Sequence, residues 1–144
     1  MDYQGPMREI LFICSGNVGR SQMAEAFWNG LSKNYHASSA GTSVGEREGE
    51  HLHGYVLDAM RELNYDLSER VRKQLTQDMV RDAYRVVSMV DKETLSKYIT
   101  DPSKVIFWGV ADARGTSLEF HRNVRDQIKS LVEDLYRELD DAAA

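Results

Sequence analysis

Short apolar or β-branched runs recur along the chain and predict four strands, over residues 10–13, 35–40, 85–89 and 105–108. The first run, Ile-Leu-Phe-Ile, is apolar at every position and does not alternate with polar residues. Continuous apolar strands are typical of parallel sheets that are covered on both faces. The pattern therefore predicts a buried parallel sheet.

Between and after these runs, apolar residues recur three and four positions apart, which is the period of a helix with one buried face. This spacing predicts helices over residues 21–31, 52–63 and 79–83, and a longer helix around 124–135. Ser21 stands where it can cap the first of them. Alternating strands and helices indicate an α/β fold, a three-layer, four-stranded parallel doubly wound sheet with helices on both faces.

The length of 144 residues suits one domain, and no linker, internal repeat or low-complexity tract interrupts it. We expect a single domain over residues 1–144, with a short N-terminal tail over 1–8 and a frayed end over 140–144. In doubly wound sheets, ligands bind beyond the carboxyl ends of the strands. The loop after the first strand lies at such an end, so it is the first candidate for chemistry.

Eighteen basic and 23 acidic residues give the chain a net charge of -5, which argues against nucleic acid or an anionic membrane as main partner. No stretch approaches the roughly 20 apolar residues of a membrane helix, and the start lacks the apolar core of a signal peptide. We therefore expect a cytoplasmic protein. The single cysteine, Cys14, excludes an internal disulfide and fits a reducing compartment. A lone cysteine is more often a buried small hydrophobe than a reactive thiol, so its surroundings decide.

Cys14 and Arg20 bracket a five-residue loop with two glycines that runs directly into a predicted helix. The helix start offers unpaired N–H groups and the positive end of its dipole. Glycines let further amides turn inward, and an arginine offers a bidentate fork to oxyanion oxygens. These features predict a phosphate-binding cradle for a tetrahedral anion. Its residues are Ser15, Gly16, Asn17, Val18, Gly19 and Arg20. The same positive field favours the thiolate of Cys14, which makes this residue a candidate nucleophile.

Two residues of this region are candidates for supporting roles. Ser21 offers a hydroxyl to the thiolate, and Asn17 offers an amide that braces the loop backbone. Both residue types also favour helix caps and turns, so ordinary capping and turn formation explain them equally well.

The sequence LFICSGNVGRSQMAE over residues 11–25 resembles the signature of the low-molecular-weight protein tyrosine phosphatase superfamily, which includes related arsenate reductases. The likeness continues through residues 39–42 and 75–89, and from Asp112 to the helix that contains residues 124–126. It covers nearly the whole chain. The fold of this superfamily is the four-stranded parallel sheet with flanking helices that the hydrophobic pattern also predicts.

The resemblance implies a role for several residues. Cys14 becomes the nucleophile and Asp112 the mobile general acid and base, while the loop amides and Arg20 hold the oxyanion. Asn17 and Ser39 correspond to the pair whose hydrogen bond holds the loop in shape. The implied reaction is a double displacement through a phosphocysteine, with no metal and no cofactor. Without the resemblance, Asp112 is better interpreted as a turn residue.

The chain departs from the phosphatase pattern at four places. Gly19 stands where phosphatases usually have a second, protective cysteine, and Gln22 replaces a proline. An Ala-Arg-Gly sequence follows Asp112 in place of a proline and an aromatic pair, so the usual wall for a phosphotyrosine ring is missing. Lys73 replaces a usual arginine. Gln22 and Lys73 are more similar to single-cysteine arsenate reductases that use a small external thiol.

Three hypotheses about function follow. The leading one is a phosphomonoester hydrolase, similar to protein tyrosine phosphatases, that acts through a phosphocysteine on Cys14. The alternative is an arsenate reductase that forms a Cys14-arsenate adduct and surrenders it to mycothiol or glutathione. Thioredoxin-coupled reductases need two further cysteines, so that branch is excluded. The third hypothesis is a noncatalytic anion-binding module.

The expected partners are a phosphorylated protein or small aryl phosphate, or arsenate together with a small thiol. Val18 stands where phosphoarginine phosphatases tend to have threonine, which disfavours phosphoarginine. We expect no nucleic acid or membrane partner, and a monomer or weak dimer. The four histidines lack the three- or four-residue spacing of helical metal pairs, so no metal site is predicted.

Overall fold

The structure is a computed structural model that describes residues 8–32 and 34–143. Within them, four parallel strands form one sheet in the order β2-β1-β3-β4, with β1 inside the sheet. The strands are β1 (Arg8–Cys14), β2 (Tyr35–Gly41), β3 (Arg85–Ser88) and β4 (Val105–Phe107). The predicted four-stranded parallel sheet is confirmed.

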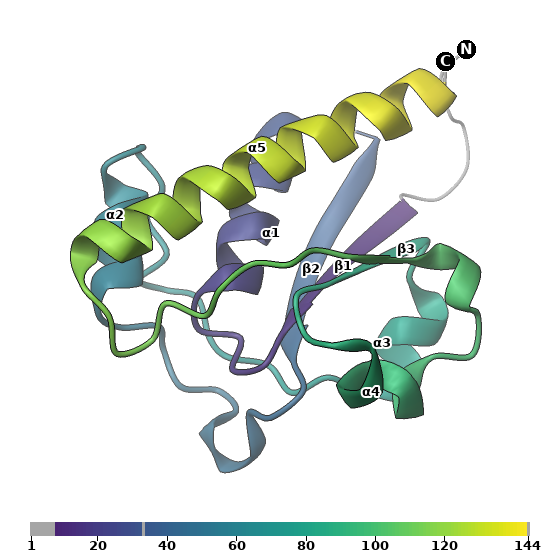
Figure 1. The fold of residues 1–144 in the computed structure, drawn as a ribbon, viewed down its shortest axis with the longest axis horizontal. Helices are drawn as coiled ribbons and strands as arrows, with labels where there is room; N and C mark the ends of the chain where they lie inside the picture. The colour runs from purple at the N-terminus through teal and green to yellow at the C-terminus, as the bar shows by residue number, and fades with distance from the viewer. Residues whose placement is uncertain (1–7, 33, 144) are drawn as a thin grey trace.

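Helices cover both faces of this sheet, as Figure 1 shows. Helices α1, α2 and α5 lie on one face, and the shorter α3 and α4 lie on the other. Their bounds are α1 (Arg20–Leu31), α2 (Tyr55–Arg61), α3 (Gln77–Asp82), α4 (Lys92–Leu95) and α5 (Leu118–Ala143). Three short 3-10 turns are η1 (Gly45–Arg47), η2 (Ser96–Tyr98) and η3 (Pro102–Lys104). The three-layer α/β prediction is therefore also confirmed.

The burial of β1 explains why its sequence is apolar at every position. Ile10 and Phe12 pack into a cluster shared with α1 and α5, whereas Leu11 and Ile13 pack into a second cluster shared with α3 and α4. Successive side chains of a strand point to opposite faces of the sheet. Because helices cover both faces here, each position of β1 must be apolar.

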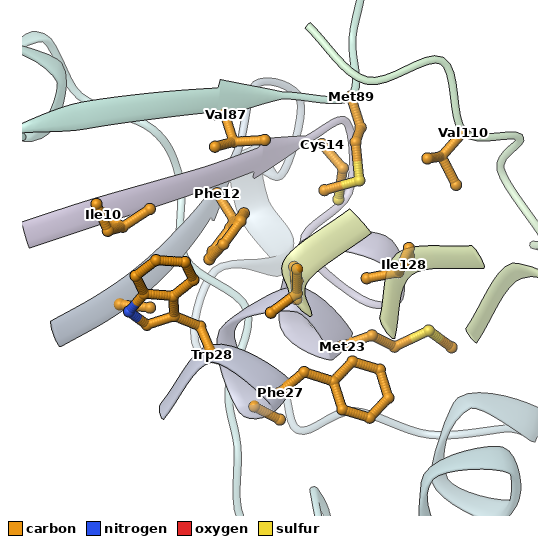
Figure 2. Close-up of a cluster of buried hydrophobic side chains, with 14 of the residues drawn as sticks. Ile10, Phe12, Cys14, Met23, Phe27, Trp28, Val87, Met89, Val110 and Ile128 are labelled. Carbon is orange, nitrogen blue, oxygen red and sulfur yellow. The ribbon is translucent and has the colours of Figure 1, made fainter. Parts of the chain in front are cut away.

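The larger cluster is built around Trp28 and Phe12, whose ring centroids lie 6.2 Å apart. Figure 2 shows the two rings with Ile10 of β1 and Ile128 of α5 among the side chains of this cluster. The indole N–H of Trp28 donates to a main-chain carbonyl at 3.1 Å, so its burial leaves no polar atom unpaired. Cys14 belongs to the same cluster, at the carboxyl end of β1.

Several element ends differ from the predictions. Helix α1 begins at Arg20 with Gly19 at the cap position and no side-chain cap, so the predicted capping by Ser21 is wrong. Helix α4 was not predicted, because four residues are too few to show a helical period. The helical backbone of α5 runs to Ala143, and the expected fraying over 140–144 stays a prediction.

The predicted N-terminal tail over 1–8 ends one residue too late, because Arg8 already pairs with Tyr35 in the sheet. The other residues of that tail lie outside the described part of the chain. Among residues 8–32 and 34–143, no helix has the length and apolar character needed to cross a membrane.

The carboxyl ends of the strands meet at one edge of the sheet and position the candidate site. Cys14 is in register with Gly41 of β2, and Ile13 is in register with Ser88 of β3. The amide of Met89, just after β3, donates to the carbonyl of Ile13 at 2.8 Å. The segments that follow β1, β2 and β3 therefore lie next to one another, as expected for a doubly wound sheet.

Candidate active site

The loop between β1 and α1 is held against the end of β2 by backbone contacts. The amides of Thr42 and Ser43 donate to the carbonyls of Cys14 and Ser15, at 3.0 and 2.9 Å. A Cβ on Gly41 would lie 2.5 Å from the Ser15 carbonyl oxygen, closer than atoms can approach. Gly41 therefore lets the loop lie directly on the strand end.

Asn17 organises the interior of the loop. It is fully buried and has a left-handed backbone, with φ of 51°, which asparagine tolerates better than most residues. Its Oδ1 accepts from the Lys73 amide at 2.8 Å and from Nε2 of Gln22 at 2.9 Å. Its Nδ2 donates to the hydroxyls of Ser21 and Ser39, at 2.8 and 3.0 Å. Because a backbone amide can only donate, the bond from Lys73 fixes which amide atom of Asn17 is oxygen.

The thiol of Cys14 lies inside this network. Its Sγ is 2.9 Å from the Ser21 hydroxyl, and the residue is 2% exposed. Asn17 already donates to the Ser21 oxygen, so the hydroxyl proton of Ser21 is free to point at the sulfur. The structure thus brings Asn17 and Ser39 together, as the resemblance implied, and places Ser21 beside Cys14, as its position in the loop suggested. Their roles in a reaction stay predictions.

Arg20 is anchored by one end of its guanidinium group. Its Nη1 donates to the carbonyls of Met89 and Val110, at 2.9 and 3.0 Å. Its Nη2 lies 3.3 Å from the Ser15 hydroxyl and 3.8 Å from the carboxylate of Asp112. The hydrogen bonds to the two carbonyls fix the plane of the guanidinium group. They leave Nη2 facing the loop and Asp112, where it can donate to a bound oxyanion.

Asp112 lies beside the loop in an ion pair with Arg114. Its Oδ2 is 2.9 Å from Nη2 of Arg114, and its Oδ1 accepts the Arg114 amide at 3.0 Å. Partial burial by itself would raise the pKa of Asp112, but the hydrogen bonds from Arg114 and the charge of Arg20 lower it overall. In the resting site Asp112 is therefore a carboxylate.

The adjacent cations Arg72 and Lys73 make different contacts near the loop. The amino group of Lys73 lies 3.7 Å from the carboxylate of Glu25, and burial together with the charge of the nearby Arg70 lowers the pKa of Lys73. The adjacent Arg72 approaches the loop. It is 3% exposed, and its Nε donates to the Gly16 carbonyl at 3.0 Å. The sequence comparison singled out Lys73 at the place of a usual arginine and did not identify Arg72.

Sequence reasoning missed the bracing roles of two buried polar residues of α1, although it noted Gln22 as a departure from the phosphatase pattern. Glu25 accepts the Ser39 hydroxyl at 2.8 Å and forms an ion pair with Arg70, so it orients the serine that Asn17 contacts. Gln22 is fully buried and bonds both Asn17 and the Val71 carbonyl, at 2.9 and 3.0 Å. Both positions lie outside the apolar stripe that predicted this helix, so the local pattern gave no signal of their burial.

A cavity of about 480 Å³ opens beside the loop. Loop residues Val18, Gly19 and Arg20 line it, together with Asp112. The remaining walls come from η1, the starts of α2 and α5, and the segment that follows Asp112. No group of three or more histidine, cysteine or acidic side chains able to hold a metal occurs in the described part of the chain.

The comparison with known families agrees with this geometry. Residues 9–144 match the family model described as low molecular weight phosphotyrosine protein phosphatase. This chain belongs to that family. The match includes the whole loop, Ser39 and Asp112.

Individual relatives of this phosphatase-family chain include both reductases and phosphatases. This chain is 30% identical over 128 residues to arsenate reductase 1 of Staphylococcus saprophyticus and to an arsenate reductase of Staphylococcus aureus. Each match covers 88% of this chain and 94% of the relative. A low molecular weight protein tyrosine phosphatase from T. tengcongensis has a TM-score of 0.82 at 24% identity, covering 91% and 99% of the two chains. An arginine phosphatase from Geobacillus stearothermophilus has a TM-score of 0.85 at 24% identity, covering 94% of each chain. At such identities the structural likeness shows the fold alone.

Proposed function

We propose that this family member is a phosphomonoester hydrolase that works through a phosphocysteine on Cys14. One observation carries the proposal: the only thiol of the chain lies inside an anion-binding loop with Arg20 and Asp112 beside it. Hydrolysis needs a nucleophile, an anion cradle, an acid and base, and water, and the chain supplies the first three. Reduction needs further thiols that the chain lacks.

In the first step, the Cys14 thiolate attacks phosphorus while the bond to the ester oxygen breaks. The loop amides and Arg20 hold the phosphoryl oxygens, and Asp112 gives its proton to the leaving oxygen. In the second step, Asp112 accepts a proton from water as the water oxygen attacks phosphorus. The sulfur–phosphorus bond breaks and inorganic phosphate leaves.

Asp112 must be protonated before the first step, although its pKa is lowered in the resting site. A phosphate dianion in the loop adds negative charge near this carboxylate and takes up the charge of Arg20, 3.8 Å away. Both effects raise the pKa of Asp112. Substrate binding thus prepares the acid that the reaction uses.

Arsenate reduction is the second candidate, because the relatives by sequence include staphylococcal arsenate reductases. In this reaction Cys14 displaces water from arsenate and forms a sulfur–arsenic bond. An external thiol then attacks the Cys14 sulfur, so arsenite leaves with the two electrons and a mixed disulfide remains. A second external thiol restores Cys14 and releases a small disulfide. Mycothiol and glutathione are the thiols to supply.

A side-by-side assay distinguishes these functions. Wild type and Cys14→Ser are given phenyl phosphate, or arsenate with glutathione or mycothiol. Phosphate release by wild type only, without arsenite, supports the hydrolase. Arsenite formation without phosphate release supports the reductase. Neither product, with phosphate still bound, supports the anion-binding module, and activity that survives in Cys14→Ser overturns the assignment of the nucleophile.

A further inference from the structure

The cavity beside the loop is strongly cationic, although the whole chain has a net charge of -5. Arg20, Arg47, Arg72 and Arg114 line it, and Asp112 is the one carboxylate among its lining residues. A concentration of one charge sign in a cavity with low-dielectric walls raises the local concentration of ligands of opposite sign. The cavity therefore selects anions more strongly than the sequence composition suggests.

This charge exceeds what one oxyanion requires. Arg20 is assigned to the oxyanion in the loop, and the charge of Arg114 is partly neutralised by Asp112 at 2.9 Å. Arg72 has an acidic neighbour in Glu50, but at 3.5 Å and with that side chain half exposed, so the pairing is weak. Arg47 forms no ion pair within the described residues, and its guanidinium group stays available to a ligand.

Free donors also converge at one place. Nη2 of Arg72 and Nη1 of Arg114 have no acceptor among residues 8–32 and 34–143, and both are donors. Each lies within 3.3 Å of the point where a Cβ of Gly16 would stand. Two such nitrogens beside the same point, in a cavity that Arg47 also lines, form a natural contact for a carboxylate or a second phosphate.

Apolar side chains form much of the remaining cavity wall, beside His53, Thr116 and His121. Val18, Met23 and Val124 contribute aliphatic surface, and Tyr55 adds a ring whose centroid lies 5.6 Å from that of His121. The wall therefore fits an organic body such as an aryl ring, which agrees with an aryl ester in the loop.

From these observations we infer that the preferred substrate is an aryl phosphomonoester with a second anionic group, which Arg47, Arg72 and Arg114 bind. The inference rests on the proposed hydrolase and specifies its substrate class. It assigns a binding role to the Ala-Arg-Gly sequence after Asp112, because Arg114 supplies one of the free donors. If these arginines only brace the loop, charge on the organic group has no effect on binding.

A binding experiment separates the inference from catalysis. Cys14→Ser is titrated with the para and meta isomers of carboxyphenylphosphonate and carbamoylphenylphosphonate, which differ in charge but hardly in shape. We expect at least one carboxylate isomer to bind about 10-fold more tightly than its carboxamide, because charged contacts to arginine are replaced by neutral ones. This preference falls as the salt concentration is raised from about 0.05 M to about 0.5 M, because added salt shortens the Debye length and screens the charged contact. Equal affinity of carboxylate and carboxamide in both isomers overturns the inference.

Variants locate the effect. Arg47→Gln in the Cys14→Ser background reduces the preference to about 3-fold or less, because one of the free cations is lost. Arg137→Gln removes the same charge from an exposed position on α5, paired with Asp134, and leaves the preference unchanged. An equal loss in both variants indicates a general charge effect and overturns the assigned contact. A carboxylate preference that is unchanged in Arg47→Gln also overturns the assigned contact.

Turnover by the wild type keeps the two proposals apart. Hydrolysis of phenyl phosphate without any advantage for carboxyphenyl phosphate in kcat/KM refutes the substrate class and leaves the hydrolase standing. A carboxylate preference in binding, with no ester hydrolysed, refutes the hydrolase and keeps the anionic contact. Failure of Cys14→Ser to bind any of the phosphonates refutes both.

Discussion

The hydroxyl of Ser21 lies 2.9 Å from the sulfur of Cys14. Asn17 donates to the oxygen of this hydroxyl, and the hydroxyl proton is free to be donated to a Cys14 thiolate. A hydrogen bond to an ionised group contributes about 1.5–3 kcal/mol, which corresponds to about 10- to 150-fold in rate. We therefore expect Ser21→Ala to lower kcat/KM for phenyl phosphate by about this factor, measured at neutral pH.

Ser38→Ala is the control for this prediction. Ser38 is adjacent to Ser39 on β2, and no side-chain hydrogen bond of Ser38 occurs within the described part of the chain. This variant keeps wild-type kcat/KM. If Ser21→Ala also keeps the wild-type rate, the hydroxyl does not assist the thiolate.

The sequence predicted the layers of the fold because hydrophobic periodicity reports burial directly. The continuous run in β1 shows this clearly, since Leu11 and Phe12 face opposite helical layers. The loop was also predictable, because glycine, arginine and a helix start are local features. The short α4 was not, because its four residues depend on tertiary contacts, above all the burial of Leu95.

Contacts between distant segments were harder to predict. For Ser21 the sequence left two roles open, a helix cap and a hydroxyl offered to Cys14, and only the folded structure, in which α1 begins one residue earlier, places the hydroxyl beside the sulfur. Lys73 and Arg72 are adjacent cations, and only the folded course of their segment directs Arg72 to Gly16. The role of Glu25 depends on Ser39, 14 residues later, which local pattern cannot reveal.

The close approach at Gly41 leads to a second prediction. A Cβ there would lie 2.5 Å from the Ser15 oxygen and 2.9 Å from the Asn17 nitrogen, both backbone atoms of the loop. Because the backbone cannot move aside without distorting the loop, we expect Gly41→Ala to lower the melting temperature and to weaken binding of phosphate by about 10-fold or more. Calorimetry and phosphate titration measure both effects.

Gly109→Ala is the matched variant for Gly41→Ala. It adds the same methyl group, but a Cβ at Gly109 has no heavy atom within 4 Å. We expect its phosphate affinity to equal that of the wild type. Equal losses in the two variants contradict a specific contact between Gly41 and the loop.

The link between α2 and α5 makes stability depend on pH. Glu62 accepts from Arg122 and from Arg125, whose Nη1 also donates to the Ala59 carbonyl. Hydrogen bonds from Arg122, then from Arg125, lower the pKa of Glu62 from 4.5 to about 2. A carboxyl with a lowered folded-state pKa stabilises the protein above its unfolded pKa, and this contribution disappears as pH falls through the folded value.

Glu62→Gln should therefore lower the urea midpoint at pH 7, and the difference from wild type should shrink as the pH falls from 4.5 to about 2. Glu138→Gln removes an exposed carboxylate that forms no ion pair among the described residues, and it should change the midpoint little at any pH. A Glu62→Gln difference that stays constant across this range contradicts the ion-pair origin of the effect.

The last prediction concerns Asp112, which is paired with Arg114, as the proposed general acid. Asparagine keeps the shape of Asp112 but cannot give a proton to a leaving oxygen. We expect Asp112→Asn to lower kcat for phenyl phosphate by about 100- to 10,000-fold, the usual contribution of a general acid.

The leaving group decides whether this loss is due to proton transfer. Nitrophenolate leaves without protonation far more readily than phenolate, so 4-nitrophenyl phosphate should lose much less rate in Asp112→Asn. The carboxylate also holds Arg114 at 2.9 Å, and a purely structural loss would slow both esters equally. Measuring kcat for both esters in wild type and variant separates the two causes. Equal losses make Asp112 a positioning residue for Arg114, and an unchanged rate on phenyl phosphate removes it from the mechanism.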